Sequence, residues 1–294
     1  MHRDKYVMSS AMNISEALKE ASSFLAEAGI WEAESNARLL LGNLLGQSPA
    51  AFLAAQREPF PAEHKAAWEA AVTRKAAGEP AQYIIGEQEF YGLPFKVSPT
   101  VLIPRPETEL LVERIAELGQ RLWPGGSPAA ADIGTGSGAI AAALKSLRPA
   151  WQVTATDISP AALEVARDNA RRLELDIAFK QGNLLEPLAG EAPDLIVSNP
   201  PYIPARDIEG LQTEVRDYEP RSALDGGADG LDPYRVMMEQ LPLLKAPPRL
   251  IGFELGMGQA GDVAELLRRA GHWTEIEIIK DYAGIERHVI GIDL

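Results

Sequence analysis

The chain has 294 residues, of which 46% are hydrophobic and 24% charged, the composition of an ordinary globular protein. Its formal net charge of −14 disfavours nucleic-acid binding, which depends largely on lysine and arginine neutralising phosphates. The absence of cysteine excludes disulfides, thiolate nucleophiles and cysteine-based metal sites. The four histidines are scattered and indicate no metal site. Because neither a membrane span nor an apolar signal core is apparent, we expect a cytoplasmic protein.

The first 80 residues are predicted to form a small helical bundle. After a loose end over residues 1–12, apolar residues recur at helical spacing over 14–25 and again over 33–45. Proline-rich turns enclose a short third helix, and a fourth is expected at about 62–77. This alanine- and leucine-rich segment contains no cluster of candidate catalytic residues. We interpret it as a domain that recognises a partner, with simple packing against the rest of the chain as the alternative.

Residues 81–103 differ in composition from the bundle before them. The runs 82–85 and 89–97 are rich in aromatic and β-branched residues, and a Gly-Leu-Pro turn accompanies them. This pattern predicts a β-hairpin that connects two domains. In the next segment, 103–109, two prolines hold the chain extended before a helix that reaches about residue 118. The segment is either ordinary helix punctuation or the edge of a pocket.

From residue 129 onward, strands and helices alternate, which is typical of a doubly wound parallel sheet. The last two expected strands are joined by a connection too short for a crossover helix, so this final pair should be antiparallel. The expected strands lie at 129–132, 152–156, 177–179, 194–198, 249–254, 274–280 and 288–292.

A glycine-rich turn follows the first of these strands. Gly134, Thr135, Gly136, Ser137 and Gly138 lead directly into an apolar helix. Glycines allow close approach of the backbone to a ligand, and a helix start offers free N–H groups. The second strand ends in Asp157, where a carboxylate can accept hydrogen bonds from both ribose hydroxyls. Capping of the helix that begins at Ser159-Pro160 is the alternative role for Asp157.

The spacing of this turn favours S-adenosylmethionine over a dinucleotide. A pyrophosphate-binding turn reads G-x-G-x-x-G, whereas here Gly138 comes one position early. No second mononucleotide-binding half is apparent, so a cofactor with ribose and adenine but no phosphate fits better. After the third strand, Asn183 could hydrogen-bond the adenine amino edge and Leu184 could cover one face of the ring.

The candidate catalytic residues are Asn199, Pro200, Pro201 and Tyr202, which follow the buried strand 194–198, and Asn199 is also expected to contact the cofactor. The prolines end that strand, so the motif lies at its carboxyl end, where ligands bind in open α/β sheets. Amide and aniline-type nitrogens are poor nucleophiles because their lone pair is delocalised. Asn199 Oδ1 and the Pro200 carbonyl could accept the two hydrogens of such an NH₂ group, while Tyr202 stacks on its plane. A plain strand-to-loop turn is the alternative.

Further motifs extend over nearly the whole chain, and they lie at 74–80, 85–93, 102–109, 132–138, 199–203, 218–224, 230–232 and 281–287. Together they resemble the bacterial release factor glutamine methyltransferases, the PrmC/HemK family. The resemblance implies an α/β fold of the class I S-adenosylmethionine-dependent methyltransferases. This fold is Rossmann-like, with a mostly parallel seven-stranded sheet and an antiparallel last strand. The implied domains are a helical bundle at 1–80, a β-hairpin linker at 81–103 and the methyltransferase domain at 104–294.

The resemblance also implies a substrate and a partner. The enzyme would methylate the side-chain amide nitrogen of the glutamine in the Gly-Gly-Gln motif of class I peptide-chain release factors. The bundle would dock the release factor, and we expect a monomer that acts in translation termination without binding nucleic acid directly. Many family members carry Asp-Trp where Asn183-Leu184 stand, so the adenine contacts here depart from the family pattern.

Three other functions remain open from the sequence. Nucleic-acid adenine methyltransferases also use an Asp/Asn-Pro-Pro-aromatic motif, because the exocyclic amine poses the same lone-pair problem. The net charge of −14 and the absence of a basic module speak against that function. A methyltransferase for glutamine in another protein is equally compatible with the residue chemistry. A regulator that binds the cofactor without catalysis is disfavoured by the intact motif at Asn199–Tyr202.

Overall fold

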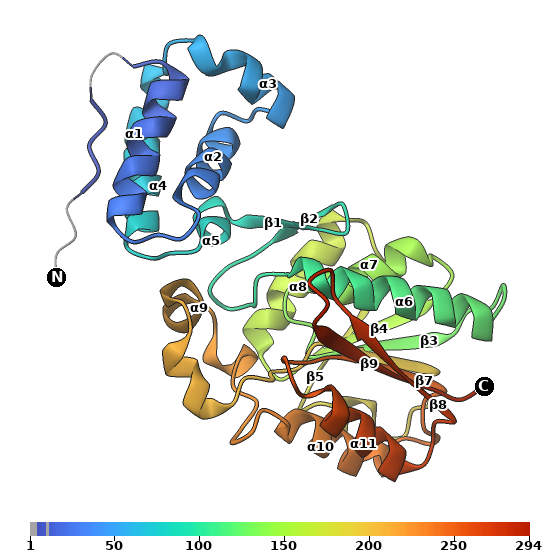
Figure 1. The fold of residues 1–294 in the computed structure, drawn as a ribbon. Coiled ribbons are helices and arrows are strands. Elements are labelled where there is room, and N and C mark those ends of the chain that lie inside the picture. Colours follow the sequence, from blue (N-terminus) through green and yellow to red (C-terminus); the bar gives the residue numbers. More distant parts are fainter. Residues whose placement is uncertain (1–4, 10–11) are drawn as a thin grey trace. The chain divides into compact units, whose positions relative to one another are not determined.

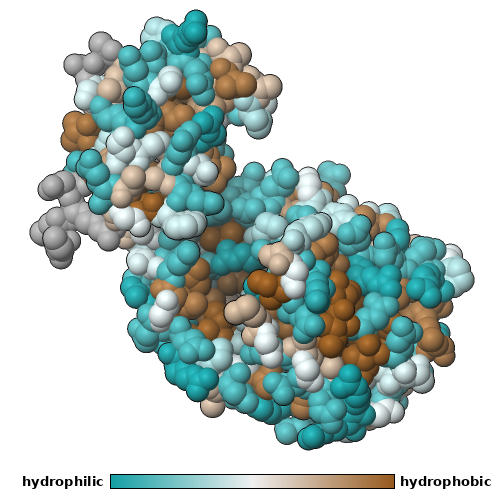
Figure 2. All heavy atoms as spheres, in the orientation of Figure 1, coloured by the Kyte–Doolittle hydropathy of each residue, from teal (hydrophilic) through white to brown (hydrophobic). Residues whose placement is uncertain are grey.

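The computed structural model describes residues 5–9 and 12–294 and divides them into two compact units (Figure 1). The first unit comprises the described residues up to Gly86 together with Gln212–Tyr218, and the second comprises Glu87–Leu211 and Glu219–Leu294. Figure 2 shows that hydrophilic side chains cover much of the visible face of each unit. Of the helices formed by the described residues, none combines the length and apolar character needed to cross a membrane.

The first unit is a bundle of short helices around an apolar core. Trp68, Leu41 and Leu25 are fully buried at its centre. The first helix has a capping box, in which the Asn13 side chain accepts from the Glu16 N–H and the Glu16 carboxylate accepts from the Asn13 N–H. The unit contains α1 (Ile14–Glu27), α2 (Ala33–Leu44), α3 (Pro49–Ala54), α4 (Lys65–Ala76), α5 (Ala81–Ile85) and α9 (Thr213–Tyr218), with 3₁₀ turns at Ala55–Arg57 and Ala62–His64.

The predicted loose end at residues 1–12 is wrong for Tyr6 and Met8, while residues 1–4 and 10–11 lie outside the described part. Tyr6 and Met8 are buried in the core of the bundle. The Tyr6 hydroxyl donates to Glu20 Oε1 at 3.0 Å, and the Met8 N–H donates to Glu69 Oε1 at 2.9 Å. Two apolar residues form no periodic pattern, so these long-range contacts left no signal in the local sequence.

The expected strand at 82–85 is also wrong, because these residues form the short helix α5. Pro80 precedes the helix and Gly86 ends it, and these boundaries outweigh the β propensity of the residues between them. The hairpin is therefore confined to β1 (Glu87–Phe90) and β2 (Leu93–Lys96), which pair antiparallel with Phe90 opposite Leu93.

The second unit is built on a seven-stranded sheet with the order β5-β4-β3-β6-β7-β9-β8. All neighbouring strands are parallel except β9, which is antiparallel to β7 and β8. This confirms the predicted mostly parallel sheet with an antiparallel last strand. The strands are β3 (Ala129–Ile133), β4 (Gln152–Asp157), β5 (Ala178–Gln181), β6 (Leu195–Ser198), β7 (Leu250–Glu254), β8 (Glu275–Lys280) and β9 (Glu286–Ile292).

Helices cover both faces of this sheet (Figure 1). Successive strand residues point to opposite faces, so Leu250 joins the core beneath one helical layer and Ile251 the core beneath the other. One layer contains α6 (Pro106–Leu122), α7 (Ala139–Leu147) and α8 (Pro160–Arg172), and the other contains α10 (Asp232–Gln240) and α11 (Ala260–Ala270). Short 3₁₀ turns at Glu186–Leu188, Ala205–Gly210, Arg221–Ala223 and Leu241–Leu243 lie in the connecting loops.

The strand register brings several loops to one edge of the sheet. Ile133 at the end of β3 lies beside Thr156 of β4 and Ser198 of β6, and Ser198 lies beside Phe253 of β7. The loops that follow these parallel strands therefore begin close together at their carboxyl ends. In doubly wound folds this edge is where ligands bind.

Candidate active site

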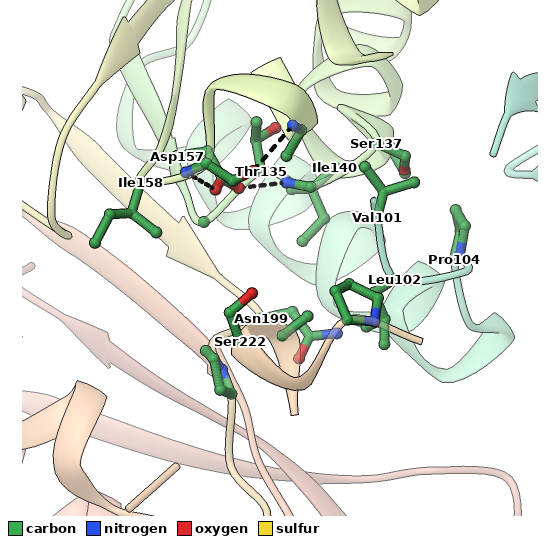
Figure 3. Close-up of a pocket in the computed structure, with 18 of the residues that line it drawn as sticks. Val101, Leu102, Pro104, Thr135, Ser137, Ile140, Asp157, Ile158, Asn199 and Ser222 are labelled. Carbon is green, nitrogen blue, oxygen red and sulfur yellow. Dashed lines mark hydrogen bonds between the residues drawn. The ribbon is translucent and has the colours of Figure 1, made fainter. Parts of the chain in front are cut away.

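A cavity of about 340 Å³ opens at this edge, entirely within the second unit. The loops after β3, β4, β5 and β6 line it, together with the extended segment that leads into α6. Figure 3 shows Asp157 and Ile158 on one side of the cavity, with Asn199 and Leu102 across from them. Its size lies within the range of small-molecule sites.

The glycine turn exposes its backbone to the cavity. Gly134 and Gly136 have φ values of +70° and +55°, and a Cβ at either position would meet nothing within 4 Å. The turn is held from beneath by Asp132, whose Oδ2 accepts from Thr135 Oγ1 at 2.6 Å and from the Ala141 N–H at 3.1 Å. Burial raises the pKa of Asp132 to about 7, against the opposing effect of these hydrogen bonds.

Asp157 lies at the carboxyl end of β4 and faces the same cavity (Figure 3). Its Oδ2 accepts from the Gly136 N–H at 2.9 Å, and its Oδ1 accepts from the Ser159 N–H at 2.9 Å. Burial raises the pKa of this carboxyl group, and the backbone hydrogen bonds oppose the rise. A carboxylate has about four acceptor positions, so about two remain for a ligand. The helix-capping alternative is partly realised, although the side chain that caps α8 is Ser159.

The Asn199 side chain is connected to two strongly buried polar groups. Its Nδ2 donates to Glu254 Oε1 at 3.0 Å and to Thr108 Oγ1 at 3.3 Å. The Thr108 hydroxyl in turn donates to Glu254 Oε2 at 2.6 Å. Glu254 and Thr108 are only 2% and 4% exposed, whereas Asn199 is half-buried and lines the cavity.

The packing of α6 on β7 explains how Thr108 comes to lie near Glu254. A Cβ at Gly252 would be 2.7 Å from the Ile115 side chain and 3.1 Å from that of Leu111, so the helix lies directly on this position. Thr108 is one helical turn before Leu111, and Glu254 is two strand residues after Gly252 on the same face. Helix and strand therefore bring the two side chains together.

Most of the predicted site residues line this one cavity: Gly134, Thr135, Gly136, Ser137, Asp157, Asn183, Leu184, Asn199 and Pro201. Gly138, Pro200 and Tyr202 are not among the lining residues. A Cβ at Gly138 would be 3.1 Å from that of Ala166, so this glycine permits close packing of α8. Tyr202 packs against the core beneath α10 and α11. Burial, with a smaller contribution from the Glu254 carboxylate, raises the pKa of Tyr202 to about 12, so the phenol is neutral.

The segment 103–109 forms an edge of the cavity, as one of its two interpretations predicted, whereas Glu219 and Glu254 were missed in the sequence. Arg105 and Thr108 both line the cavity. Buried Glu219 accepts from the Ile103 N–H at 3.2 Å and pairs with the Arg105 guanidinium. A signal for Arg105 and Thr108 was present in the two-proline segment, and Glu254 is a carboxylate at the end of an otherwise apolar strand. No comparable local signal marks Glu219.

The cavity fits S-adenosylmethionine. The open backbone at Gly134 and Gly136 leaves room for a ligand, and Asp157 retains acceptor positions for ribose hydroxyls. The apolar side chains of Ile158 and Leu184 also line the cavity and can flank a flat ring. Together, the sheet order and this site define a class I S-adenosylmethionine-dependent methyltransferase.

Comparison with known proteins identifies the family within this class. The PrmC N-terminal domain family matches residues 16–86, and the methyltransferase small domain family matches residues 106–214. The release factor glutamine methyltransferase of Moorella thermoacetica is 45% identical over 94% of this chain and 97% of its own length. The corresponding enzyme of Bacillus subtilis is 41% identical over 95% and 97%, and that of Geobacter sulfurreducens is 43% identical over 91% and 92%. The chain belongs to the release factor glutamine methyltransferase family.

Solved structures with similar folds are more distant in sequence. The METTL16 methyltransferase domain superimposes with a TM-score of 0.51 at 18% identity, over 76% of this chain and 80% of that chain. The hMettl16 catalytic domain in complex with an MAT2A 3′UTR hairpin gives a TM-score of 0.51 at 17% identity, with the same coverage. At this identity, the similarity concerns the fold alone.

Proposed function

We propose that this protein transfers a methyl group from S-adenosylmethionine to the side-chain amide nitrogen of the glutamine in the Gly-Gly-Gln motif of class I peptide-chain release factors. The observation that carries the proposal is the position of Asn199. Its amide nitrogen is engaged by Glu254 and Thr108, so its Oδ1 is left for a substrate at the cavity. The family relatives, similar over nearly their whole length, supply the choice of substrate.

In this proposal, Asn199 makes the amide nitrogen of glutamine, a weak nucleophile, reactive. S-adenosylmethionine supplies a methyl group on a positively charged sulfur. Asn199 Oδ1 and the Pro200 carbonyl accept the two hydrogens of the glutamine NH₂ group, which favours a pyramidal nitrogen and stabilises its developing positive charge. The nitrogen would gain the methyl group as the bond between the methyl carbon and sulfur breaks, with S-adenosylhomocysteine as the leaving group, and would lose one proton to solvent. Pro201 lines the cavity beside Asn199, and Tyr202 holds the motif in place by packing against the core beneath α10 and α11.

The cofactor is held by residues from three loops in this proposal. The turn Gly134–Ser137 approaches it with exposed backbone, and Asp157 accepts from the ribose hydroxyls. Asn183 and Leu184 contact the adenine. Support comes from the convergence of these residues on one cavity and from the open space in front of Gly134 and Gly136. Gly138 contributes to this site through the packing of α8.

We assign recognition of the release factor to the first unit, because it matches the PrmC N-terminal domain family and none of its described residues lines the cavity. Further parts of the proposal are that the protein acts as a monomer in the cytoplasm and binds no nucleic acid directly. The net charge of −14 supports the last point. Light scattering after size exclusion tests the oligomeric state.

The decisive experiment measures transfer of labelled methyl from S-adenosylmethionine to a purified class I release factor. The same factor with its Gly-Gly-Gln glutamine replaced by alanine serves as the control, with duplex DNA as a competing acceptor. We expect label on the intact factor alone, and Asn199→Ala should abolish it. Label on the alanine-substituted factor would contradict the assigned atom, and label on DNA would contradict the assigned substrate.

A further inference from the structure

The proposed function requires that the Asn199 amide face the cavity in one particular orientation. The two ends of an amide differ in chemistry but hardly in shape, so a 180° rotation would present hydrogens where the oxygen should be. A substrate NH₂ group brings two hydrogens of its own and needs acceptors. An Asn199 side chain that turned freely would spend part of its time in an unproductive state.

A count of protons fixes this orientation. The hydroxyl of Thr108 has one proton, which it donates to Glu254 Oε2 at 2.6 Å. Its oxygen can then only accept, and it accepts from Asn199 Nδ2 at 3.3 Å. The other Glu254 oxygen accepts from the same nitrogen at 3.0 Å. Both amide hydrogens of Asn199 are thereby engaged, and its Oδ1 is directed away from these two partners.

We propose that Glu254 and Thr108 are positioning residues, which act through Asn199 by holding its amide oxygen toward the substrate nitrogen; this inference rests on the proposed function. Neither residue has to touch the reacting atoms for this role. Hydrogen bonds that fix the orientation of an active-site group before the substrate binds reduce the reorganisation needed in the transition state.

The packing around the pair keeps it in place. Glu254 ends β7, and its own backbone carbonyl accepts from the buried Tyr234 hydroxyl at 2.7 Å. His288, which lies opposite Glu254 on β9, places Nε2 3.7 Å from the carboxylate. Burial of a carboxylate is costly, so an apolar residue at this strand end would serve stability better. Its hydrogen bonds to Thr108 and Asn199 give the buried carboxylate a function.

Paired substitutions at Thr108 test the proposal. Thr108→Val keeps the shape of the side chain and removes the hydroxyl, whereas Thr108→Ser keeps the hydroxyl. With a release factor as substrate, we expect T108V to lower kcat by about 10- to 100-fold while KM for both substrates stays within about twofold. T108S should recover most of the lost turnover. Thr274→Val makes the same chemical change just before β8, at an exposed residue that does not line the cavity, and should leave kcat unchanged.

Glu254→Gln provides an independent variant. It replaces one carboxylate oxygen by an NH₂ group, which cannot accept from Asn199 or Thr108. The variant should also lower kcat with little change in KM. The affinity for S-adenosylhomocysteine, measured by calorimetry, should stay within about twofold of the wild-type value, because the glycine turn and Asp157 are unchanged in this variant.

A readout that needs no catalysis separates this proposal from the proposed function. In protein labelled with ¹⁵N-asparagine, the side-chain NH₂ signals of Asn199 can be assigned by their loss in Asn199→Ala. We expect these hydrogens to exchange with water at least about tenfold faster in T108V than in the wild type. Unchanged exchange, or equal losses of kcat in T108V and T108S, would overturn the positioning role. An inactive wild type with the expected exchange would contradict the proposed function alone.

Discussion

The Asp157 carboxylate accepts a hydrogen bond from the Gly136 N–H at 2.9 Å, so the residue proposed to bind ribose also holds the glycine turn. Its other oxygen accepts from the Ser159 N–H at the start of α8. The glycine turn after β3 and the start of α8 therefore meet at a single side chain at the end of β4. A change at Asp157 should disturb the cofactor site in two ways at once, through lost ligand contacts and through a loosened turn.

Replacement of Asp157 should weaken cofactor binding. Asp157→Asn directs an NH₂ group at one of the two backbone N–H donors and removes the charge that strengthens bonds to ribose hydroxyls. We expect the Kd for S-adenosylhomocysteine, measured by calorimetry, to rise by about 10- to 100-fold. Asp168→Asn removes the same charge from the exposed side of α8, where Asp168 pairs with Lys96, and should leave Kd unchanged. Equal Kd values for Asp157→Asn and the wild type would contradict the ribose-binding role.

The raised pKa of Asp132 predicts a pH dependence of stability. Burial raises this pKa to about 7, whereas an unfolded aspartate titrates near about 4. Between these values the folded chain binds one more proton than the unfolded chain. The stabilising contribution of the protonated group is therefore complete below about pH 4 and is lost as pH rises through about 7. The slope reaches at most about 1.4 kcal/mol per pH unit.

The contribution of Asp132 can be isolated by comparison with Asp132→Asn, which does not titrate. Urea unfolding at pH 5, 6, 7 and 8 gives the free energy of unfolding of both proteins. We expect the free energy of unfolding of the wild type to fall relative to that of the variant between pH 5 and 7, and to fall less between pH 7 and 8. A difference that stays constant across this range would show that Asp132 keeps its ordinary pKa in the folded state.

The sheet could be predicted from the sequence because its signals are local. Short apolar runs end in glycine, aspartate or proline, and the brief connection at 281–284 requires an antiparallel last pair. α5 could not be predicted from composition, because Tyr83, Ile84 and Ile85 favour strands and only the flanking Pro80 and Gly86 indicate the helix. In this segment the strand propensity of the residues conflicted with the helix boundaries at Pro80 and Gly86, and the segment folds as a helix.

The residues of the site likewise divide into those with a local sequence signal and those brought together by long-range packing. Asn199 and Asp157 were predictable because each directly follows or ends a strand at the ligand-binding edge. The contact between Thr108 and Glu254 joins residues that are 146 positions apart. It depends on how α6 lies across Gly252, which no local pattern encodes. The contact between Thr108 and Glu254 therefore could not be predicted from the sequence, although the segment that contains Thr108 was recognised as a motif.

Glu219 should anchor the long loop that follows the Asn199 motif, which is the connection between β6 and α10. Its buried carboxylate accepts from the Ile103 N–H and pairs with Arg105, which is partly exposed. Glu219→Gln removes the charge but keeps the size, and we expect a loss of about 1–2 kcal/mol in the free energy of unfolding. Hydrogen exchange should accelerate over 219–225. Asp207→Asn, in an exposed part of the same loop, should change neither quantity, and exchange that is equally fast in both variants would argue against the anchor.

The last prediction concerns the ion pair between Lys75 and Glu214 within the first unit. Lys75 is fully buried, and its Nζ lies 2.5 Å from Glu214 Oε1 on α9. Burial lowers the pKa of Lys75, and the interaction with Glu214 opposes this effect. Glu214→Gln would leave a buried ammonium without its counter-charge. Because Glu214 is itself partly exposed, we expect Glu214→Gln to lower the free energy of unfolding by about 2–3 kcal/mol. This is at or below the low end of the loss seen when one partner of a fully buried ion pair is removed.

The double variant Lys75→Met/Glu214→Gln distinguishes this cause from a simple loss of packing. Methionine fills a similar volume without a charge, so the double variant should be more stable than Glu214→Gln alone. Urea unfolding gives the free energies of unfolding of the wild type, Glu214→Gln and the double variant. Hydrogen exchange at 213–218 reports whether α9 detaches. Asp217→Asn, on the same helix, should leave stability unchanged. If the double variant were as unstable as the single one, the uncompensated charge would not be the cause, and α9 would be held mainly by its apolar contacts.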